Sequence, residues 1–124
     1  MKLSREISQG LLTVTAVSPE AVSVDGVPYR ASLLLEPQTL SVWHVRRAAD
    51  IDAQAIADIA ARKPSLVLLG TGPRQHFLPA AVLRPLIEAG IGYEFMDTAA
   101  ACRTFNLLAS EGRRVLAALV LEDF

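Results

Sequence analysis

The sequence has little cysteine and almost no net charge, and each shortage excludes a class of protein. The single cysteine, Cys102, excludes an intramolecular disulfide and a cysteine-based metal cluster. The 12 basic and 13 acidic side chains nearly cancel. Proteins that bind nucleic acids usually carry an excess of basic residues instead. We therefore expect no nucleic-acid partner.

Long hydrophobic runs are also missing, although 52% of the 124 residues are apolar. The longest apolar runs fall far short of the roughly 20 residues that a membrane-spanning helix needs. Residues 1–10 contain no hydrophobic signal core, and Glu6 fits an organelle transit peptide poorly. These features predict a cytoplasmic protein without membrane insertion. The length predicts one domain over residues 1–124, with its core at about 12–121.

The N-terminal half contains short stretches rich in β-branched residues, separated by turns. Four of them have the composition of strands: residues 11–17, 21–24, 27–35 and 39–45. Asp25-Gly26 joins the second stretch to the third. A two-residue Asp-Gly link is a strong hairpin signal, because both turn positions need a positive φ. We predict an antiparallel β meander over this half of the chain.

The C-terminal half alternates apolar runs with helical patterns. Residues 65–70, 91–95 and 115–121 are apolar on both faces, which is typical of strands covered on both sides. Residues 79–89 and 97–111 have helical spacing, and Pro85 either bends the first of these helices or marks its first turn. The predicted fold class is α/β: the meander is followed by a β-α-β-α-β mixed sheet packed by helices. Its last strand should lie near the centre.

Gly70-Thr71-Gly72 follows the first of these strands and precedes a helix. A glycine turn in this position can present backbone amides to a phosphate or a carboxylate, and Arg74 and His76 would add positive charge. The spacing departs from Gly-x-Gly-x-x-Gly, because Gln75 stands where the third glycine belongs. The alternative is a turn that only lets strand and helix pack closely.

The start of the 97–111 helix is a second candidate region. Asp97 and Thr98 follow a strand, and the carboxyl ends of strands form the usual binding crevice of an open α/β sheet. We expect them to line one cleft with Gly70–Gly72 if their strands are neighbours, with Arg103 on the same helix. The alternative for Asp97 and Thr98 is helix capping.

Cys102 has the sequence setting of a small buried residue rather than a nucleophile. A cysteine nucleophile would need a base, and no motif ties His44 or His76 to it. We predict no catalytic residue, no metal site and no cofactor.

Three segments together resemble one known family: Gly70-Thr71-Gly72, Gly90-Ile91 and the run from Met96 to Val115 are similar to the Mth-like domain family. The resemblance covers about residues 12–121. It implies a three-layer fold, with an antiparallel β half beside a mixed sheet packed by helices. It implies no established catalytic activity. The family includes the mitochondrial complex I assembly factor 3 and an adipogenesis-associated protein, and its eukaryotic members are known for assembly or interaction roles.

Two functional hypotheses follow. The first is a non-catalytic protein-interaction or assembly module with a protein partner, and it leaves a homo-oligomer open. Because interfaces favour aromatic residues and arginine, its candidate contacts are Trp43, Phe77, Arg113 and Arg114. Core packing is the alternative for Trp43, and favourable charge at a helix end is the alternative for the arginines. The second is a small-molecule or anion binder, enzymes included, at the Gly70–Gly72 turn and the helix start.

Overall fold

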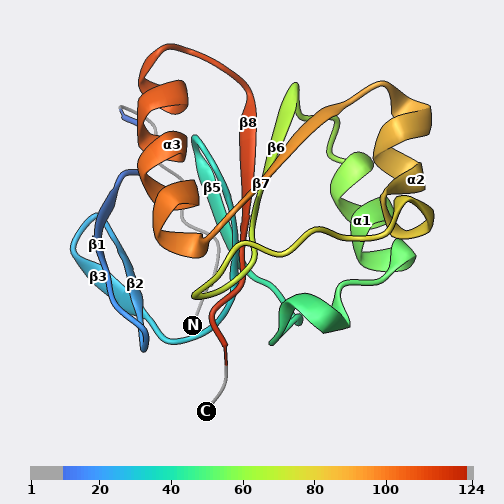
Figure 1. The fold of residues 1–124 in the computed structure, drawn as a ribbon. Coiled ribbons are helices and arrows are strands. Elements are labelled where there is room, and N and C mark those ends of the chain that lie inside the picture. The colour runs from blue at the N-terminus through green and yellow to red at the C-terminus, as the bar shows by residue number, and fades with distance from the viewer. Residues whose placement is uncertain (1–9, 123–124) are drawn as a thin grey trace.

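The computed structural model describes residues 10–122, and these form two β-sheets, three α-helices and one short 3-10 helix (Figure 1). The residues examined for a signal core lie almost entirely outside this range. The strands are β1 Val14–Val17, β2 Val22–Val24, β3 Val27–Tyr29, β4 Leu33–Glu36, β5 Thr39–Val42, β6 Leu66–Gly70, β7 Gly92–Met96 and β8 Val115–Leu119. The helices are η1 Ala48–Asp50, α1 Ala53–Ala60, α2 Ala80–Ala89 and α3 Thr98–Ser110.

The N-terminal strands are divided between the two sheets. Strands β1, β2 and β3 form a small antiparallel sheet, whereas β4 and β5 join a larger sheet of order β5-β4-β8-β6-β7. The predicted antiparallel meander is therefore confirmed for β1–β3, while the antiparallel pair β4 and β5 belongs to the larger, mixed sheet. The burial of the strands explains the division. Leu33, Leu34 and Leu35 of β4 are all buried, as an interior strand requires, while β3 buries only Tyr29.

The predicted hairpin at Asp25-Gly26 is confirmed. Val24 pairs with Val27 across a two-residue turn, and φ is 51° at Asp25 and 81° at Gly26. Both turn residues thus have the positive φ that the tight hairpin requires.

The larger sheet is mixed, as predicted. Strand β6 is parallel to β7 and β8, while β4 is antiparallel to β8 and β5. Strand β8 is central and all five of its residues are buried. Because the three parallel strands end at one edge of the sheet, the loops after Gly70 and Met96 meet the segment that follows Leu119.

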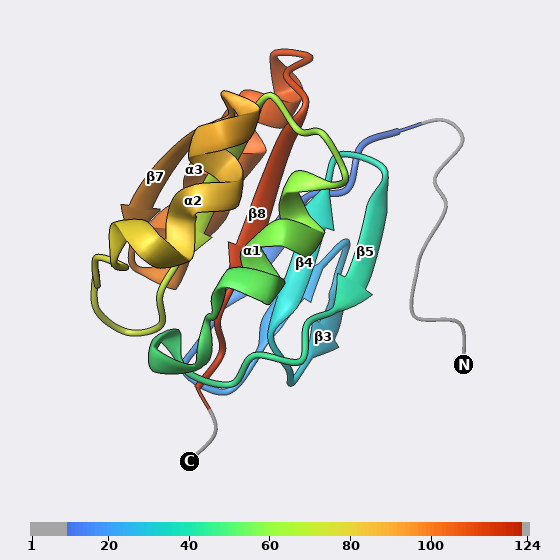
Figure 2. The same ribbon diagram turned by 90° about the vertical axis from the view of Figure 1, so that its right-hand side faces the viewer.

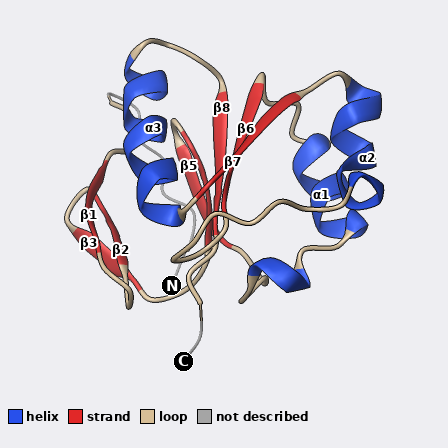
Figure 3. Ribbon diagram, in the orientation of Figure 1, coloured by secondary structure: helices blue, strands red, loops and turns tan. Residues whose placement is uncertain are grey.

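Three layers result, with the larger sheet in the middle (Figures 1 and 2). Helices α1 and α2 cover one face, and α3 with the small sheet covers the other, which Figure 3 shows in helix and strand colours. Strand β8 serves both cores by alternation: Ala117 and Leu119 pack toward α3, and Leu116 and Ala118 toward α1 and α2.

The small sheet packs on α3 through apolar side chains, and one polar side chain of α3 adds hydrogen bonds to it. Asn106 Oδ1 accepts a hydrogen bond from Val14 N at 2.9 Å, and its Nδ2 donates to Val14 O, also at 2.9 Å. The amide therefore satisfies both backbone groups of Val14 on the outer edge of β1.

Within α2, Pro85 lies well beyond the first turn, so the alternative that it marks the first turn is wrong.

Candidate functional site

The glycine turn and the start of α3 lie against each other. Gly72 N donates to Thr98 Oγ1 at 2.9 Å, and Thr98 N donates to Gly72 O at 2.8 Å. Thr98 Oγ1 in turn donates to Val120 O at 2.6 Å. Thr98 is buried, at 5% exposure. One hydroxyl thus joins the loop after β6, the start of α3 and the segment after β8.

Close packing explains the first glycine of the turn. A Cβ atom at Gly70 would lie 3.0 Å from Ala101 Cβ and 3.1 Å from Thr98 Cα. Only a residue without a side chain lets α3 start this near β6. Gly72 has a φ of +98°, a conformation that favours glycine.

The threonine between the glycines organises the loop that follows. Thr71 is fully buried, and its N donates to Met96 O at 2.9 Å. Its Oγ1 donates to Arg74 O at 2.7 Å and accepts from His76 N at 2.9 Å. The amide and the hydroxyl of Thr71 thus have partners within the protein and hold the loop that carries Arg74 and His76.

Two acidic side chains lie where an anion would have to bind. The Asp97 carboxylate caps α3 by accepting from Ala100 N at 2.8 Å, which neutralises part of the helix dipole. Glu122 lies against Gly72: a Cβ there would be 3.4 Å from Glu122 Oε2. The helix start is therefore already occupied by an acidic side chain of the protein itself.

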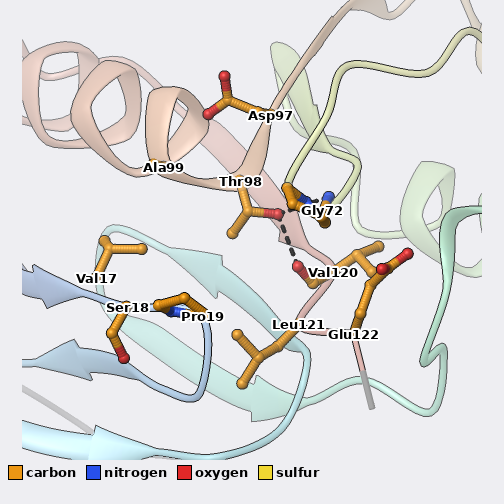
Figure 4. Close-up of a pocket in the computed structure, with 11 residues that line it drawn as sticks. Val17, Ser18, Pro19, Gly72, Asp97, Thr98, Ala99, Val120, Leu121 and Glu122 are labelled. Carbon is orange, nitrogen blue, oxygen red and sulfur yellow. Dashed lines mark hydrogen bonds between the residues drawn. The ribbon is translucent and has the colours of Figure 1, made fainter. Parts of the chain in front are cut away.

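A pocket of about 230 Å³ opens beside these residues, between the start of α3, the β1–β2 turn and the segment after β8. Figure 4 shows the side chains of Val17, Pro19 and Leu121 around it, with the Asp97 carboxylate turned away from them. The lining residues are Val17, Ser18, Pro19, Gly72, Pro73, Asp97, Thr98, Ala99, Val120, Leu121 and Glu122.

The structure gathers some of the predicted ligand-binding residues and separates others. Gly72, Asp97 and Thr98 line the pocket, so the glycine turn and the helix start do share one. Gly70 and Thr71 are buried and do not line it. Arg74 and Arg103 are exposed and are not part of its wall. A role for Arg74 and Arg103 in binding a ligand stays a prediction.

A second hollow lies at the same end of the molecule, beside the loop before α2. Its volume is about 520 Å³, and its wall includes Arg47, His76, Phe77 and Glu122. Phe77 is 75% exposed, and its ring meets that of Phe95 edge-to-face at 5.3 Å. His76, predicted as part of an anion site, thus lies in the second hollow rather than the first.

The other predicted partner contacts differ in accessibility. Trp43 is 5% exposed and packs in the core beneath α1 and α2, so its ring is not presented to a partner in this structure. Arg113 and Arg114 are exposed in the loop that leads into β8. That loop lies at the opposite end of β8 from Glu122, so these arginines belong to neither hollow.

Cys102 is buried, as its sequence setting predicts. Burial raises the pKa of its thiol to about 12, while Arg103 lowers it and Asp97 raises it to smaller extents. The thiol is therefore protonated at neutral pH, unlike an activated nucleophile.

Within residues 10–122, no three His, Cys, Asp or Glu side chains are grouped so that they could hold a metal ion. No helix in this range is long and apolar enough to cross a membrane.

Two segments of the pocket wall were not identified from the sequence. Val120–Glu122 follows β8, and the rule that parallel strands end at one edge would have placed it beside Gly72. The β1–β2 turn, Val17–Pro19, gave no comparable signal. It reaches the pocket because the small sheet packs on α3, and no local pattern encodes that contact.

Comparison with known proteins gives consistent matches. Residues 14–120 match the family described as protein of unknown function (DUF498/DUF598). The chain is 32% identical over 120 residues to the NADH dehydrogenase [ubiquinone] 1 alpha subcomplex assembly factor 3 of Danio rerio, which covers 95% of this chain and 68% of the relative. The human protein of that name is 31% identical over 120 residues, with 95% and 65% covered.

A solution structure from Bordetella pertussis, described as a Mth938-like domain, superposes with a TM-score of 0.79 at 36% identity. The match covers 99% of this chain and 94% of the other. The α/β fold and its order, an antiparallel sheet followed by a mixed sheet, are therefore those of Mth938-like domains. The chain spans about two thirds of the length of the two assembly factors.

Proposed function

The chain belongs to the protein family of unknown function DUF498/DUF598, and on this premise we propose that it is a non-catalytic protein-interaction module that assists the assembly of a protein complex. The assembly-factor relatives support the proposal, because they align with 95% of the chain. We place the protein in the cytoplasm. Because the chain spans only part of those relatives, the identity of the complex does not carry over from their names.

One observation carries the proposal: an aromatic side chain stands fixed on the surface. Phe77 is 75% exposed, although its ring packs edge-to-face on Phe95. The loop beneath it is held by the Thr71 hydrogen bonds and by Gln75 Nε2, which donates to Phe95 O at 2.9 Å. An exposed aromatic ring on an ordered loop loses little conformational entropy on binding and is typical of a protein contact.

The geometry supports the alternative of an anion binder less well. The amides of Thr71, Gly72 and Ala100 already donate to oxygens of the protein. Asp97 and Glu122 would repel an anion from the pocket they line.

A co-purification experiment with a matched control tests the proposal. The tagged full chain, Phe77→Ala and Ile87→Ala would each be expressed in the organism that encodes the protein. Ile87 is the control because it is also an exposed apolar residue, at 51%, but lies on α2. We expect a defined set of proteins to co-purify with the wild type and with Ile87→Ala, and to fall about tenfold or more with Phe77→Ala, as for an interface hot spot.

Thermal melting of the three proteins would show whether each is folded. Equal recovery of the same proteins with Phe77→Ala and with the wild type would contradict the proposed role of this surface. Absence of any specific companion from the wild-type sample would contradict the interaction function itself.

A further inference from the structure

The pocket beside Thr98 has an apolar interior whose polar wall groups are satisfied. Thr98 Oγ1 both accepts from Gly72 N and donates to Val120 O. The side chains that face the open space in Figure 4 are those of Val17, Pro19 and Leu121. An occupant would therefore be recognised by its shape and apolar surface rather than by hydrogen bonds to this wall.

The rim of the same pocket is acidic. Asp97 and Glu122 line it, and the lining residues, all within the described part of the chain, include no lysine, arginine or histidine. Both acidic residues are partly exposed, and the Asp97 carboxylate lies outside the apolar interior, turned away from Val17, Pro19 and Leu121 (Figure 4). Charge complementarity therefore favours an occupant with a positive group beside an apolar one, and disfavours phosphates and carboxylates.

The size of the pocket limits which occupants fit it. Its volume is about 230 Å³. An apolar cavity of roughly 150 Å³ holds a benzene ring, whereas pockets for drug-sized molecules begin at about 300 Å³. The space thus fits one aromatic or branched side chain and is too small for a nucleotide.

We propose that this pocket receives a single aromatic or branched apolar side chain of a protein partner, with a lysine or arginine of the partner next to it in sequence. The inference rests on the proposed interaction function and adds to it the chemistry of the segment that docks. The apolar side chain fills the space between Val17, Pro19 and Leu121, while the basic residue faces Asp97 and Glu122.

The test uses two blocked tetrapeptides that differ at one position, glycine-phenylalanine-lysine-glycine and glycine-phenylalanine-glutamate-glycine. Each is titrated into the isotope-labelled full chain while the amide chemical shifts of Val17, Thr98 and Leu121 are followed. We expect saturable shifts at these amides, with a Kd for the lysine peptide about threefold to fivefold lower than for the glutamate peptide, since rim charges contribute modestly.

Matched variants assign the effect to the pocket. Ala99→Leu fills the pocket from the second position of α3, and Ala81→Leu makes the same change at the second position of α2. Asp97→Asn removes the rim charge but keeps a capping side chain, and Asp52→Asn does the same at the cap of α1. We expect only Ala99→Leu to abolish the shifts, and only Asp97→Asn to reduce the difference between the peptides.

Three results would overturn the inference. One is the absence of saturable shifts with the lysine peptide, and another is equal affinity for the two peptides. The third is saturation by benzylamine without binding of the lysine peptide, which would indicate a small-molecule site. Because the assay contains no native partner, these results leave the co-purification test of the proposed function untouched, and failure of that test leaves the peptide result standing.

Discussion

Single hydroxyl groups shape the candidate site. Thr98 and Thr71 are both buried, and both use Oγ1 as donor and acceptor at once. A buried polar atom that keeps its hydrogen-bond partners lowers the stability of the fold little, whereas one that loses them lowers it substantially. Thr98 therefore joins the loop after β6 to the start of α3 and to the segment after β8, and Thr71 joins the same loop to the end of β7.

Cys102 leads to a prediction about pH. Burial raises the pKa of its thiol from 9.0 to about 12, so above pH 9 the unfolded chain loses the proton before the folded chain does. The unfolded state then binds fewer protons, and the free energy of unfolding must fall as the pH rises from about 9 toward 12. Cys102 contributes a slope of up to about 1.4 kcal/mol per pH unit. Urea denaturation of the wild type between pH 8 and 10.5 measures it.

The control is Cys102→Ala, which loses some packing but has no thiol to ionise. Its stability should fall less steeply with pH than that of the wild type, because other groups that titrate in this range are shared by the two proteins. Parallel pH profiles for the two proteins would contradict the assignment of the effect to the thiol.

The contact between β6 and α3 depends on the absence of a side chain at Gly70. Gly70→Ala would place its Cβ 3.0 Å from Ala101 Cβ and 3.1 Å from backbone Thr98 Cα. We expect it to lower the free energy of unfolding by about 1–3 kcal/mol, as overpacking does in cores. Gly92→Ala on β7 is the matched control, since its Cβ would meet only Leu66 Cδ1 at an ordinary 3.5 Å.

Urea denaturation of both variants gives the comparison. We expect Gly92→Ala to be as stable as the wild type or slightly more stable, since alanine has less conformational freedom in the unfolded chain. A Gly70→Ala variant as stable as Gly92→Ala would mean that α3 can move away from β6 at little cost.

At the scale of elements, the sequence predicted what depends on local pattern and missed what depends on partners. The Asp25-Gly26 hairpin, the Asp97 cap and the buried central strand β8 follow from turn chemistry, capping and apolar runs. The position of β4 and β5 in the larger sheet could not be predicted in this way, because the composition of a strand does not determine which strand it pairs with. For the same reason the sequence did not predict that Val17–Pro19 lines the pocket, since this turn reaches the pocket only because the small sheet packs on α3.

At the scale of the whole molecule, the features that suggest binding gather at one end. The pocket and the second hollow share Glu122 in their walls, and Phe77 stands beside the second hollow. This is the end where β6, β7 and β8 finish, visible at the bottom of the sheet in Figure 1. Open α/β sheets commonly bind at this edge. The sequence predicted the edge from the order of strands and helices, but not the acidic character of the pocket rim.

The most direct test of the account places a photo-crosslinking amino acid at single positions of the full chain in living cells. Variants at Phe77 and Ser18 report on the proposed contact end, and a variant at exposed Glu111, before β8, reports on the opposite end. We predict that Phe77 and Ser18 crosslink to the same protein and that Glu111 does not. Crosslinks from Glu111 alone, or none from Phe77 and Ser18, would contradict the claim that this chain works by holding a protein at the carboxyl edge of its sheet.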